Sequence, residues 1–580
     1  MKFNYAPLVD PTVTIRVLVV EPGGWDEPII CSLRHVDLQD EPHYEAISYC
    51  WGGSVKSQAV ILHGSPLAVT KNAHGALRNF RREYGQSQRN LWIGSICIDQ
   101  ANEAEKAHQV AIMGDIYRKS THTLVWLGED DGTIADARQN IAEHYIIGAG
   151  ASGSHQWPYP ACVGEVVNLY ERPWFSRLWV VQEVILSPVS TFVSGENEVD
   201  WPEVGKAATW LLYKAGGNGK CDVPPERRAG LWNASGMWKK FDVEHGMNAK
   251  NPAPQLERLS LCELVWNTVR FNVSEPKDRI FAVLGLTKWS ATNMALPEAL
   301  RPDYSKNLYS VYRDAITVDL AERKELGILE GGIVDQQSIF SCEKIQTPTW
   351  VHRWDKMETE EDPGQLAWWL FKASGEKTEI SVSWFQIPQS LLVRGAKVDH
   401  IRMVSDTIRR SDFQSVEKQR DLLSSLWLYV KQGSKDCESE SVFTFSLILV
   451  GGSVNRRRAE KYPNHSRNFA AYLDWLGLCP WIGTIHHPVK LDASGDPKEF
   501  EDAMVYALRN RRLFVTREGY IRIGSQLIQE NDLVCVLQGA NMPYILRPNE
   551  PYYHSLWTCY VPGIMDGETD AFRKMLFDIR

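Results

Sequence analysis

The sequence predicts an α/β fold for the N-terminal part of the chain, followed by a mostly helical middle and a small β-rich C-terminal module. The first prediction rests on one central stretch that reads as strand, helix and strand. LWIGSICI (91–98) and HTLVWLG (122–128) are unbroken apolar runs of the length expected of buried strands. Between them, Val110, Met113 and Tyr117 recur at helical spacing. A strand–helix–strand unit of this length predicts a parallel sheet with helices packed on its faces.

Polar side chains follow both of these predicted strands. Asp99 and Gln100 come directly after the first strand, and Glu129 and Asp130 come after the second. Ligands of parallel sheets bind beyond the carboxyl ends of the strands. We therefore expect a site at this edge of the sheet.

The flanking sequence predicts further elements of the same domain. HYEAISYCWGG (43–53) reads as a strand that stops at Gly52 and Gly53, which permit a sharp turn or a close approach of the backbone to a ligand. Asn102 and Glu105 predict a capping box at the start of the central helix. Other expected elements are a first strand at 12–20, a partner strand at 29–33, a hairpin at 59–69 and a helix at 72–84.

The character of the sequence changes three times after this domain. It is mostly helical from 201 to 330, mixed and charged from 331 to 500, and alternating from 501 to the end. Short apolar runs between Gly, Asn and Pro in the last stretch are typical of a small antiparallel sheet or barrel. We therefore expect four segments, 1–200, 201–330, 331–500 and 501–580.

Composition excludes several classes of function. The chain has 580 residues, of which 44% are hydrophobic and 23% charged, as in soluble globular proteins of two to four domains. A net charge of -9 argues against a nucleic-acid surface, and we expect the basic clusters 456–458 and 509–512 to be solvated or paired with acids. The longest apolar run, 442–450, is too short to span a bilayer.

The cysteines and histidines predict neither disulfides nor a metal site. The 11 cysteines show no CxxC spacing, and Cys97 lies in an apolar run where nothing would activate its thiol. His486 and His487 have no acidic partners in register. The N-terminus has no signal-like apolar core. We therefore expect a cytoplasmic protein with reduced thiols and without membrane contact.

Five stretches resemble a known family. YEAISYCWGG (44–53), the central stretch 91–129 and RPWFSRLWVVQE (172–183) resemble the three hallmark blocks of fungal heterokaryon incompatibility (HET) domains. SEPKDRIFAVLGL (274–286) resembles the segment that often follows this domain, and 511–568 resembles the usual closing module. The resemblance implies a role in fungal nonself recognition and programmed cell death. It also implies an N-terminal domain similar in fold to Toll/interleukin-1 receptor (TIR) domains, which are flavodoxin-like and several of which cleave NAD.

The same resemblance implies a catalytic glutamate. Enzymatic TIR domains carry it in a W-x-x-x-E-like helix motif, which Trp179 and Glu183 match here. A carboxylate at this place could stabilise the oxocarbenium character that develops when the nicotinamide–ribose bond breaks, and Trp179 could line the nicotinamide pocket. NAD would then be the substrate, and no cofactor is expected. The alternative is that Glu183 pairs within the fold with Arg177 or Arg172.

Other candidate binding residues also have two interpretations. Tyr49, Trp51 and Gly52 follow a strand and could shape an adenine or ribose pocket, although aromatic residues there are as often part of a core. Asp99 and Gln100 could bind ribose hydroxyls, but a role in a turn or helix cap is at least as frequent.

One departure from the family pattern bears on activity. Most HET domains have an acidic residue where this sequence has Gly94. This favours a second function, a non-catalytic signalling module that acts by self-assembly or by binding an incompatibility partner. A third is an enzyme of small-molecule metabolism on the same scaffold.

Overall fold

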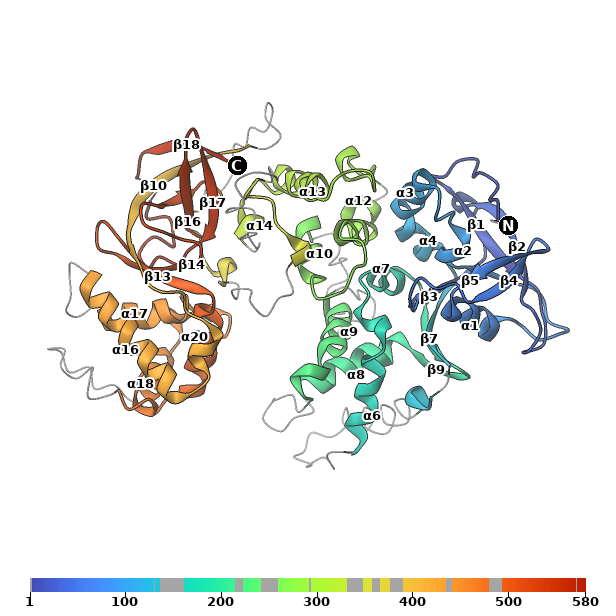
Figure 1. The fold of residues 1–580 in the computed structure, drawn as a ribbon, viewed down its shortest axis with the longest axis horizontal. Coiled ribbons are helices and arrows are strands. Elements are labelled where there is room, and N and C mark those ends of the chain that lie inside the picture. The colour runs from blue at the N-terminus through green and yellow to red at the C-terminus, as the bar shows by residue number, and fades with distance from the viewer. Residues whose placement is uncertain are drawn as a thin grey trace. The chain divides into compact units, whose positions relative to one another are not determined.

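The structure is a computed structural model of the chain. It describes residues 3–129, 131–135, 161–213, 223–240, 259–291, 294–330, 348–356, 366–375, 390–433, 441–478, 493–569 and 571–580. These residues form two compact units, Met1–Val311 and Tyr312–Arg580 (Figure 1). Asp130, His486 and His487, which entered the sequence predictions, lie outside the described residues.

The N-terminal unit contains a nine-stranded sheet in the order β5-β4-β2-β1-β6-β3-β7-β8-β9. Within this sheet the four adjacent strands β6, β3, β7 and β8 run parallel to one another, as predicted. β1 joins them antiparallel, so the whole sheet is mixed rather than parallel. The strands are β1 (Thr14–Val20), β2 (Ile30–Asp37), β3 (Glu45–Tyr49), β4 (Gln58–Leu62), β5 (Ser65–Val69), β6 (Arg89–Trp92), β7 (His122–Gly128), β8 (Ser190–Ser194) and β9 (Asn197–Asp200).

The order of the parallel strands defines where a ligand site belongs. From β3 the chain runs outward to β6 and then crosses back to β7 on the other side of β3. Such a reversal creates a crevice at the carboxyl ends of the two strands that flank it. In this unit those strands are β3 and β7.

Helices of the N-terminal unit pack on this sheet and extend beyond it (Figure 1). They are α1 (Lys71–Phe80), α2 (Gly94–Cys97), α3 (Glu103–Ala111), α4 (Met113–Lys119), α6 (Ala161–Tyr170), α7 (Val180–Ile185), α8 (Trp201–Tyr213), α9 (Ala229–Lys240), α10 (Leu261–Asn267), α11 (Asp278–Phe281) and α12 (Lys288–Ala291). α13 (Leu308–Arg323) crosses the boundary between the two units, and α14 (Gly327–Glu330) belongs to the C-terminal unit.

Two details of the central stretch differ from the prediction. The run 91–98 is not one strand, because β6 ends at Trp92 and Gly94 begins the helical turn α2. Cys97 is buried there, and burial raises the pKa of its thiol to about 12, as expected of an inert cysteine. The predicted helix breaks at Ile112 into α3 and α4, with Val110 and Tyr117 buried on one side.

The predicted capping box is also incomplete. Asn102 caps α3 by accepting a hydrogen bond from the amide of Glu105 at 3.2 Å. The Glu105 carboxylate, however, accepts two bonds from Arg16, at 2.6 and 2.8 Å, and one from the amide of Asp99. Arg16 is 1% exposed, and a buried guanidinium requires a counter-charge, so it takes the carboxylate that would have completed the box.

The C-terminal unit is built on a seven-stranded sheet in the order β14-β13-β10-β15-β16-β17-β18. β10 also pairs with β18, which closes five of the strands into a barrel, as the sequence predicted. The prediction missed β10, which lies in the stretch with no clear pattern. The strands are β10 (Leu391–Val404), β13 (Arg511–Thr516), β14 (Ile521–Ser525), β15 (Leu533–Leu537), β16 (Tyr544–Asn549), β17 (Tyr552–Thr558) and β18 (Lys574–Ile579).

Four helices pack with this sheet around one apolar core (Figure 1). They are α16 (Val416–Gly433), α17 (Ser441–Leu449), α18 (His465–Trp475) and α20 (Pro497–Leu508); a two-stranded ladder of β11 (Ser453–Val454) and β12 (Arg457–Arg458) joins them. None of the helices in the described ranges is long and apolar enough to cross a membrane.

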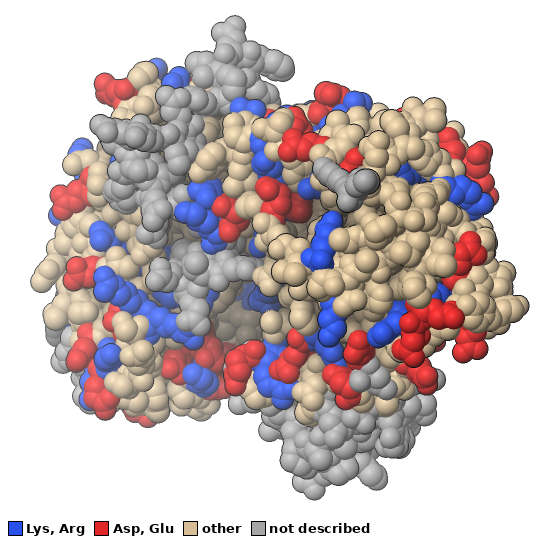
Figure 2. Space-filling view, turned by 45° about the vertical axis from the view of Figure 1, so that its right-hand side comes forward, with Lys and Arg blue, Asp and Glu red and all other residues tan. Residues whose placement is uncertain are grey.

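The arginines of the two basic clusters in the C-terminal unit differ in their surroundings. Arg458 forms ion pairs with Glu460 and Asp566, as predicted. Arg511, in contrast, is 3% exposed, and one of its bonds goes to the carbonyl of Ala507 at 2.7 Å. Burial lowers its pKa to about 10. On the face shown in Figure 2, basic and acidic side chains are interspersed over short distances.

Candidate functional site

The carboxylate of Glu183 lies at the carboxyl end of β3, where the sheet topology places a ligand site. Glu183 is in the short helix α7 and is only 5% exposed. The hydroxyl of Ser48, near the end of β3, donates a hydrogen bond to Glu183 Oε2. The indole N–H of Trp174 donates to the Ser48 oxygen at 2.8 Å. These three side chains form a buried polar chain that joins the 3₁₀ turn Pro173–Ser176, β3 and α7.

Arg177 covers the other side of this carboxylate. Its Nη2 lies 3.9 Å from Glu183 Oε1, and its Nη1 donates to the carbonyl of Tyr49. The pair that the sequence offered as an alternative role for Glu183 is therefore present with Arg177. Arg172 instead pairs with Asp131. The side chain of Arg177 is 22% exposed and that of Glu183 is 6% exposed, so the guanidinium stands on the solvent side.

Burial and the nearby charge shift the pKa of Glu183 in opposite directions. Desolvation raises the pKa of its carboxyl above the usual range, because the charged form loses its hydration. The positive charge of Arg177 and the hydrogen bond from Ser48 both lower that pKa, but by less. Glu183 is thus a carboxyl group with a raised pKa that is paired with the guanidinium of Arg177.

The predicted residues at the end of β3 have different surroundings. Tyr49 is buried, and its hydroxyl donates to Ser95 at 2.7 Å; burial raises its pKa to about 12. Trp51 is 44% exposed. Gly52 has a φ of 70°, and a side chain there would meet the amide of Asn72 at 2.7 Å, so the turn requires glycine. Only Tyr49 is connected to Glu183, through the contacts of Arg177.

Asp99 and Gln100 make local contacts. Asp99 Oδ1 accepts from the amide of Ala101 at 3.1 Å, and Gln100 donates to the carbonyl of Gly94 at 2.8 Å. These are bonds of a turn, and they do not link either side chain to Glu183. Within the described parts of the chain, no group of three or more His, Cys, Asp or Glu side chains is placed to hold a metal ion.

Two parts of the chain match models of known protein families. Residues 44–183 match the family model "Heterokaryon incompatibility protein (HET)", and residues 486–577 match "Het-6 beta-barrel domain". The chain contains a HET domain and a Het-6 barrel domain. It is 23% identical to "Heterokaryon incompatibility protein 6, OR allele" of Neurospora crassa, over 98% of this chain and 96% of that protein. No solved structure matches this chain.

The match to the HET domain includes every member of the buried polar chain. Ser48 belongs to the first block, and Trp174, Arg177 and Glu183 belong to the third. Ser48 and Trp174 were not among the predicted site residues. Both lie inside the blocks that carry predicted site residues, and two blocks that build one site are expected to contact each other through their polar side chains.

Trp179 lies in the same block but faces a different partner. Its indole N–H donates to Asp278 Oδ2 at 2.9 Å, and the hydroxyl of Tyr304 donates to Asp278 Oδ1 at 2.8 Å. Asp278 opens the helix α11 in the segment that follows the HET domain. Burial raises the pKa of Asp278. Trp179 therefore anchors α7 to this segment.

The segment after the HET domain holds α7 at a second point. Its Gly285 approaches Gly114 of α4 so closely that a Cβ on Gly285 would lie 2.7 Å from the Gly114 Cα and would also clash with Oε1 of Gln182 in α7. Close approach without side chains lets α4, α7 and this segment pack directly. The helix that carries Glu183 is consequently fixed by residues inside the family match and by residues that follow it.

Proposed function

We propose that this chain is a fungal heterokaryon-incompatibility effector, and that its HET domain cleaves NAD at the nicotinamide–ribose bond through Glu183. The observation that carries the second part is the place of the Glu183 carboxylate, held by Ser48 at the carboxyl end of β3, where the strand order reverses between β3 and β7. The order of the four parallel strands is that of flavodoxin-like sheets, which supports a TIR-like fold. The name of the Neurospora crassa relative supports the role in incompatibility.

The chemistry requires few groups. As the nicotinamide–ribose bond breaks, its electron pair moves to the pyridinium nitrogen, and nicotinamide leaves as a neutral molecule. The ribose carbon acquires oxocarbenium character, which a carboxylate stabilises electrostatically. Water then attacks that carbon and loses a proton, giving ADP-ribose. Glu183 supplies the carboxylate in this scheme.

Arg177 has a defined part in this reaction. It is the cation paired with Glu183, and its side chain reaches solvent. A substrate pyrophosphate would compete for the guanidinium, since Arg binds phosphate oxygens well. Withdrawal of Arg177 toward the pyrophosphate would uncover the carboxylate at the moment when substrate arrives.

A second function is favoured by a different observation. Glu183 is enclosed by Ser48 and Arg177, whereas Trp51, after the end of β3, is 44% exposed. An enclosed carboxylate with an exposed aromatic side chain suits a non-catalytic module that self-assembles or binds a partner protein. In that case Glu183 would stabilise the fold.

A heterokaryon assay in a fungal host tests the role in incompatibility. One strain expresses the chain, the other carries the allele under test, and viability is scored after fusion in the cytoplasm they share. We expect death of the fused cells with the unaltered chain and survival with Glu183→Gln. Death that persists with Glu183→Gln, in cells with normal amounts of NAD, would favour the assembly function. Survival in every combination tested would contradict a role in incompatibility.

A further inference from the structure

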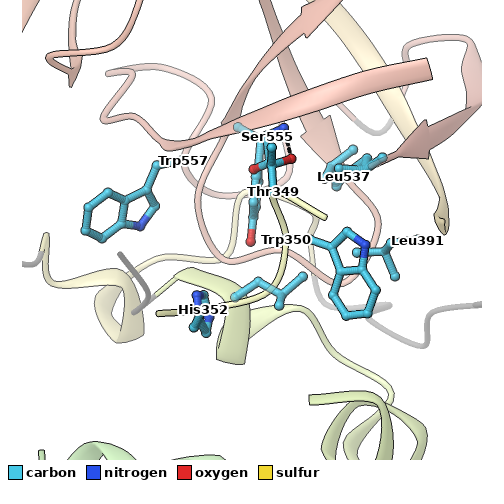
Figure 3. A pocket seen from close by; sticks show the side chains of 10 residues that line it. Thr349, Trp350, His352, Leu391, Leu537, Ser555 and Trp557 are labelled. Atoms are coloured by element: carbon cyan, nitrogen blue, oxygen red, sulfur yellow. Dashed lines mark hydrogen bonds between the residues drawn. The ribbon is translucent and has the colours of Figure 1, made fainter. Parts of the chain in front are cut away.

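The two strands that close the Het-6 barrel, β10 and β18, have a buried side and an exposed side. β18 pairs antiparallel with β10, and its residues Phe577 and Ile579 are buried. Ile579 lies opposite Leu391, and both line a small pocket in the barrel (Figure 3). The enclosed part of this pocket has room for about one water molecule. A larger ligand of these two strands would therefore bind on their exposed side.

Three apolar side chains are exposed in β18 and in the turn before it. Phe572 is 41% exposed, Met575 39% and Leu576 55%. Met575 lies opposite Gly395, which has no side chain to cover it. Single exposed apolar residues are common on protein surfaces, but these three lie within five consecutive residues. Contiguous apolar patches of this kind mark interaction surfaces.

Basic side chains lie next to these apolar ones. Leu576 is directly opposite Arg394 of β10, so the two side chains share one face of the strand pair. Lys397 comes directly after the stretch of β10 that pairs with β18, and Arg573 comes directly before β18. All three basic side chains are exposed, and within the described residues none of them forms an ion pair. We call these six residues the β18 surface: Phe572, Met575, Leu576, Arg394, Lys397 and Arg573.

The β18 surface has no acidic residues among its neighbours in either strand. Residues 391–398 and 571–577 contain no Asp or Glu. The next acidic residue along β18, Asp578, pairs with Arg580 at 3.2 Å. Asp570, before the turn, lies outside the described residues. The described part of this surface is therefore positively charged, in a chain whose net charge is -9.

We propose that the β18 surface docks the protein on a membrane that contains anionic phospholipids. Phenylalanine and leucine next to lysine and arginine are typical of protein surfaces that lie between the headgroups and the acyl chains. The long stems of Arg394 and Lys397 let their charged ends reach the lipid phosphates while the apolar side chains enter the acyl boundary. A protein partner fits less well, since lysine is depleted in protein–protein interfaces. Because the chain as a whole is negative, attraction to this local surface orients the C-terminal unit on the membrane.

This proposal departs from the sequence-based expectation that the chain has no membrane contact. That expectation rested on the lack of a long apolar run, which bears on helices that span a bilayer and not on strands that lie at its surface. The proposal is also independent of NAD cleavage, since the β18 surface belongs to the C-terminal unit and Glu183 to the N-terminal unit.

Co-sedimentation of the full-length protein with vesicles tests the proposal. The vesicles consist of phosphatidylcholine alone, or of phosphatidylcholine with phosphatidylserine as one lipid in three. We expect binding to the mixed vesicles to be at least tenfold tighter than to phosphatidylcholine alone. It should weaken at high salt, because salt screens exposed charges. An excess of soluble phosphoserine should not release the protein, since it offers the anionic group without the acyl boundary.

A double variant tests the apolar contribution. Phe572→Ser combined with Leu576→Ser should weaken binding to the mixed vesicles at least tenfold, because it removes the side chains that enter the acyl boundary. Leu428→Ser combined with Phe443→Ser is the matched control, since these residues of α16 and α17 are 52% and 45% exposed in the same unit. The control should bind like the unaltered protein.

A second double variant tests the charges. Arg394→Gln combined with Arg573→Gln should also weaken binding at least tenfold and should reduce its dependence on salt. Arg456→Gln combined with Arg457→Gln removes the same charge from another exposed part of this unit and should leave binding unchanged. All the altered residues are exposed, so we expect every variant to fold, which circular dichroism verifies.

Several results would overturn the proposal. They are equal binding to both kinds of vesicle, binding to neither, release by phosphoserine, and equal losses in the variants and their matched controls. Polyglutamate serves as a soluble acidic probe. Binding of polyglutamate by a protein that sediments with neither vesicle would assign the β18 surface to an acidic protein segment instead.

Discussion

The hydroxyl of Ser48 donates a hydrogen bond to the carboxylate of Glu183 and accepts one from the Trp174 indole. Ser48 is 1% exposed, so neither neighbour can turn to water when this hydroxyl is removed. The bond also connects two sequence blocks that are 135 residues apart. The position of Glu183 therefore depends on a side chain at the end of β3.

We expect Ser48→Ala to destabilise the N-terminal unit by about 1–3 kcal/mol, because it leaves two buried polar groups without a partner. The loss should be larger at pH 8 than at pH 5, since the lost bond favours the ionised form of Glu183. Thermal unfolding at the two pH values measures this. Ser120→Ala is the control: Ser120 is also buried but donates only to the neutral carbonyl of Tyr117, so its smaller loss should not depend on pH. Equal pH dependence of both variants would contradict the account.

The sequence predicted β3 and β7 well, because both are short and largely buried strands whose apolar residues are visible in the sequence. It could not predict where one run divides. In 91–98 the apolar pattern continues through Gly94, and only the tertiary structure turns the chain into α2. Glu105 likewise satisfies the local rule for a capping box, but a distant arginine takes its carboxylate.

The candidate site was predicted only in part for a related reason. Glu183 came from a resemblance, and its contact with Arg177 was considered because the two are close in sequence. Ser48 and Asp278 reach Glu183 and Trp179 across 135 and 99 residues, and no local pattern reports such contacts. β10 was missed because the strand lies in a charged stretch and pairs on both sides with strands of the distant C-terminal end.

Gly285→Ala should destabilise the N-terminal unit by about 1–3 kcal/mol, because the added methyl group would clash with Gly114 and Gln182 in a packed interior. Gly236→Ala is a matched control: Gly236 lies within α9, and a Cβ there meets nothing within 4 Å. Since alanine favours helix, the control should gain up to about 1 kcal/mol. Chemical denaturation measures both. A neutral effect of Gly285→Ala would show that the close approach of the glycines is not required.

Asp278→Asn should loosen α7 without unfolding the domain. An amide keeps one acceptor but cannot accept from both Trp179 and Tyr304 as the carboxylate does. We expect faster hydrogen exchange of the amides from 180 to 186, by about tenfold, while the amides of β3 and β7 keep their protection. Asp303→Asn is the control, because Asp303 bonds to nearby Ser305 in an exposed turn. Unchanged exchange in α7 would mean that Trp179 is not its anchor.

Glu330 should make the C-terminal unit less stable as the pH rises. Burial raises its pKa from 4.5 to about 8, so the folded state holds a proton that the unfolded state has released. Stability contributed by this group is complete below pH 4.5 and is lost as the pH rises to about 8, by at most about 5 kcal/mol. Glu330→Gln cannot ionise, so its stability should exceed that of the unaltered protein increasingly from pH 5 to 8. Parallel curves in denaturation experiments would contradict this.

The most direct test of the proposed function is the release of nicotinamide from NAD by the purified full-length protein. Glu183→Gln is compared with Glu45→Gln, a half-buried carboxylate at the opposite end of β3 that pairs with Arg89 at 2.6 Å. We predict turnover by the unaltered protein and by Glu45→Gln, and a loss of at least a hundredfold in a folded Glu183→Gln. Turnover that survives Glu183→Gln, or no turnover by the unaltered protein at any concentration, would contradict the assignment of Glu183 as the catalytic carboxylate.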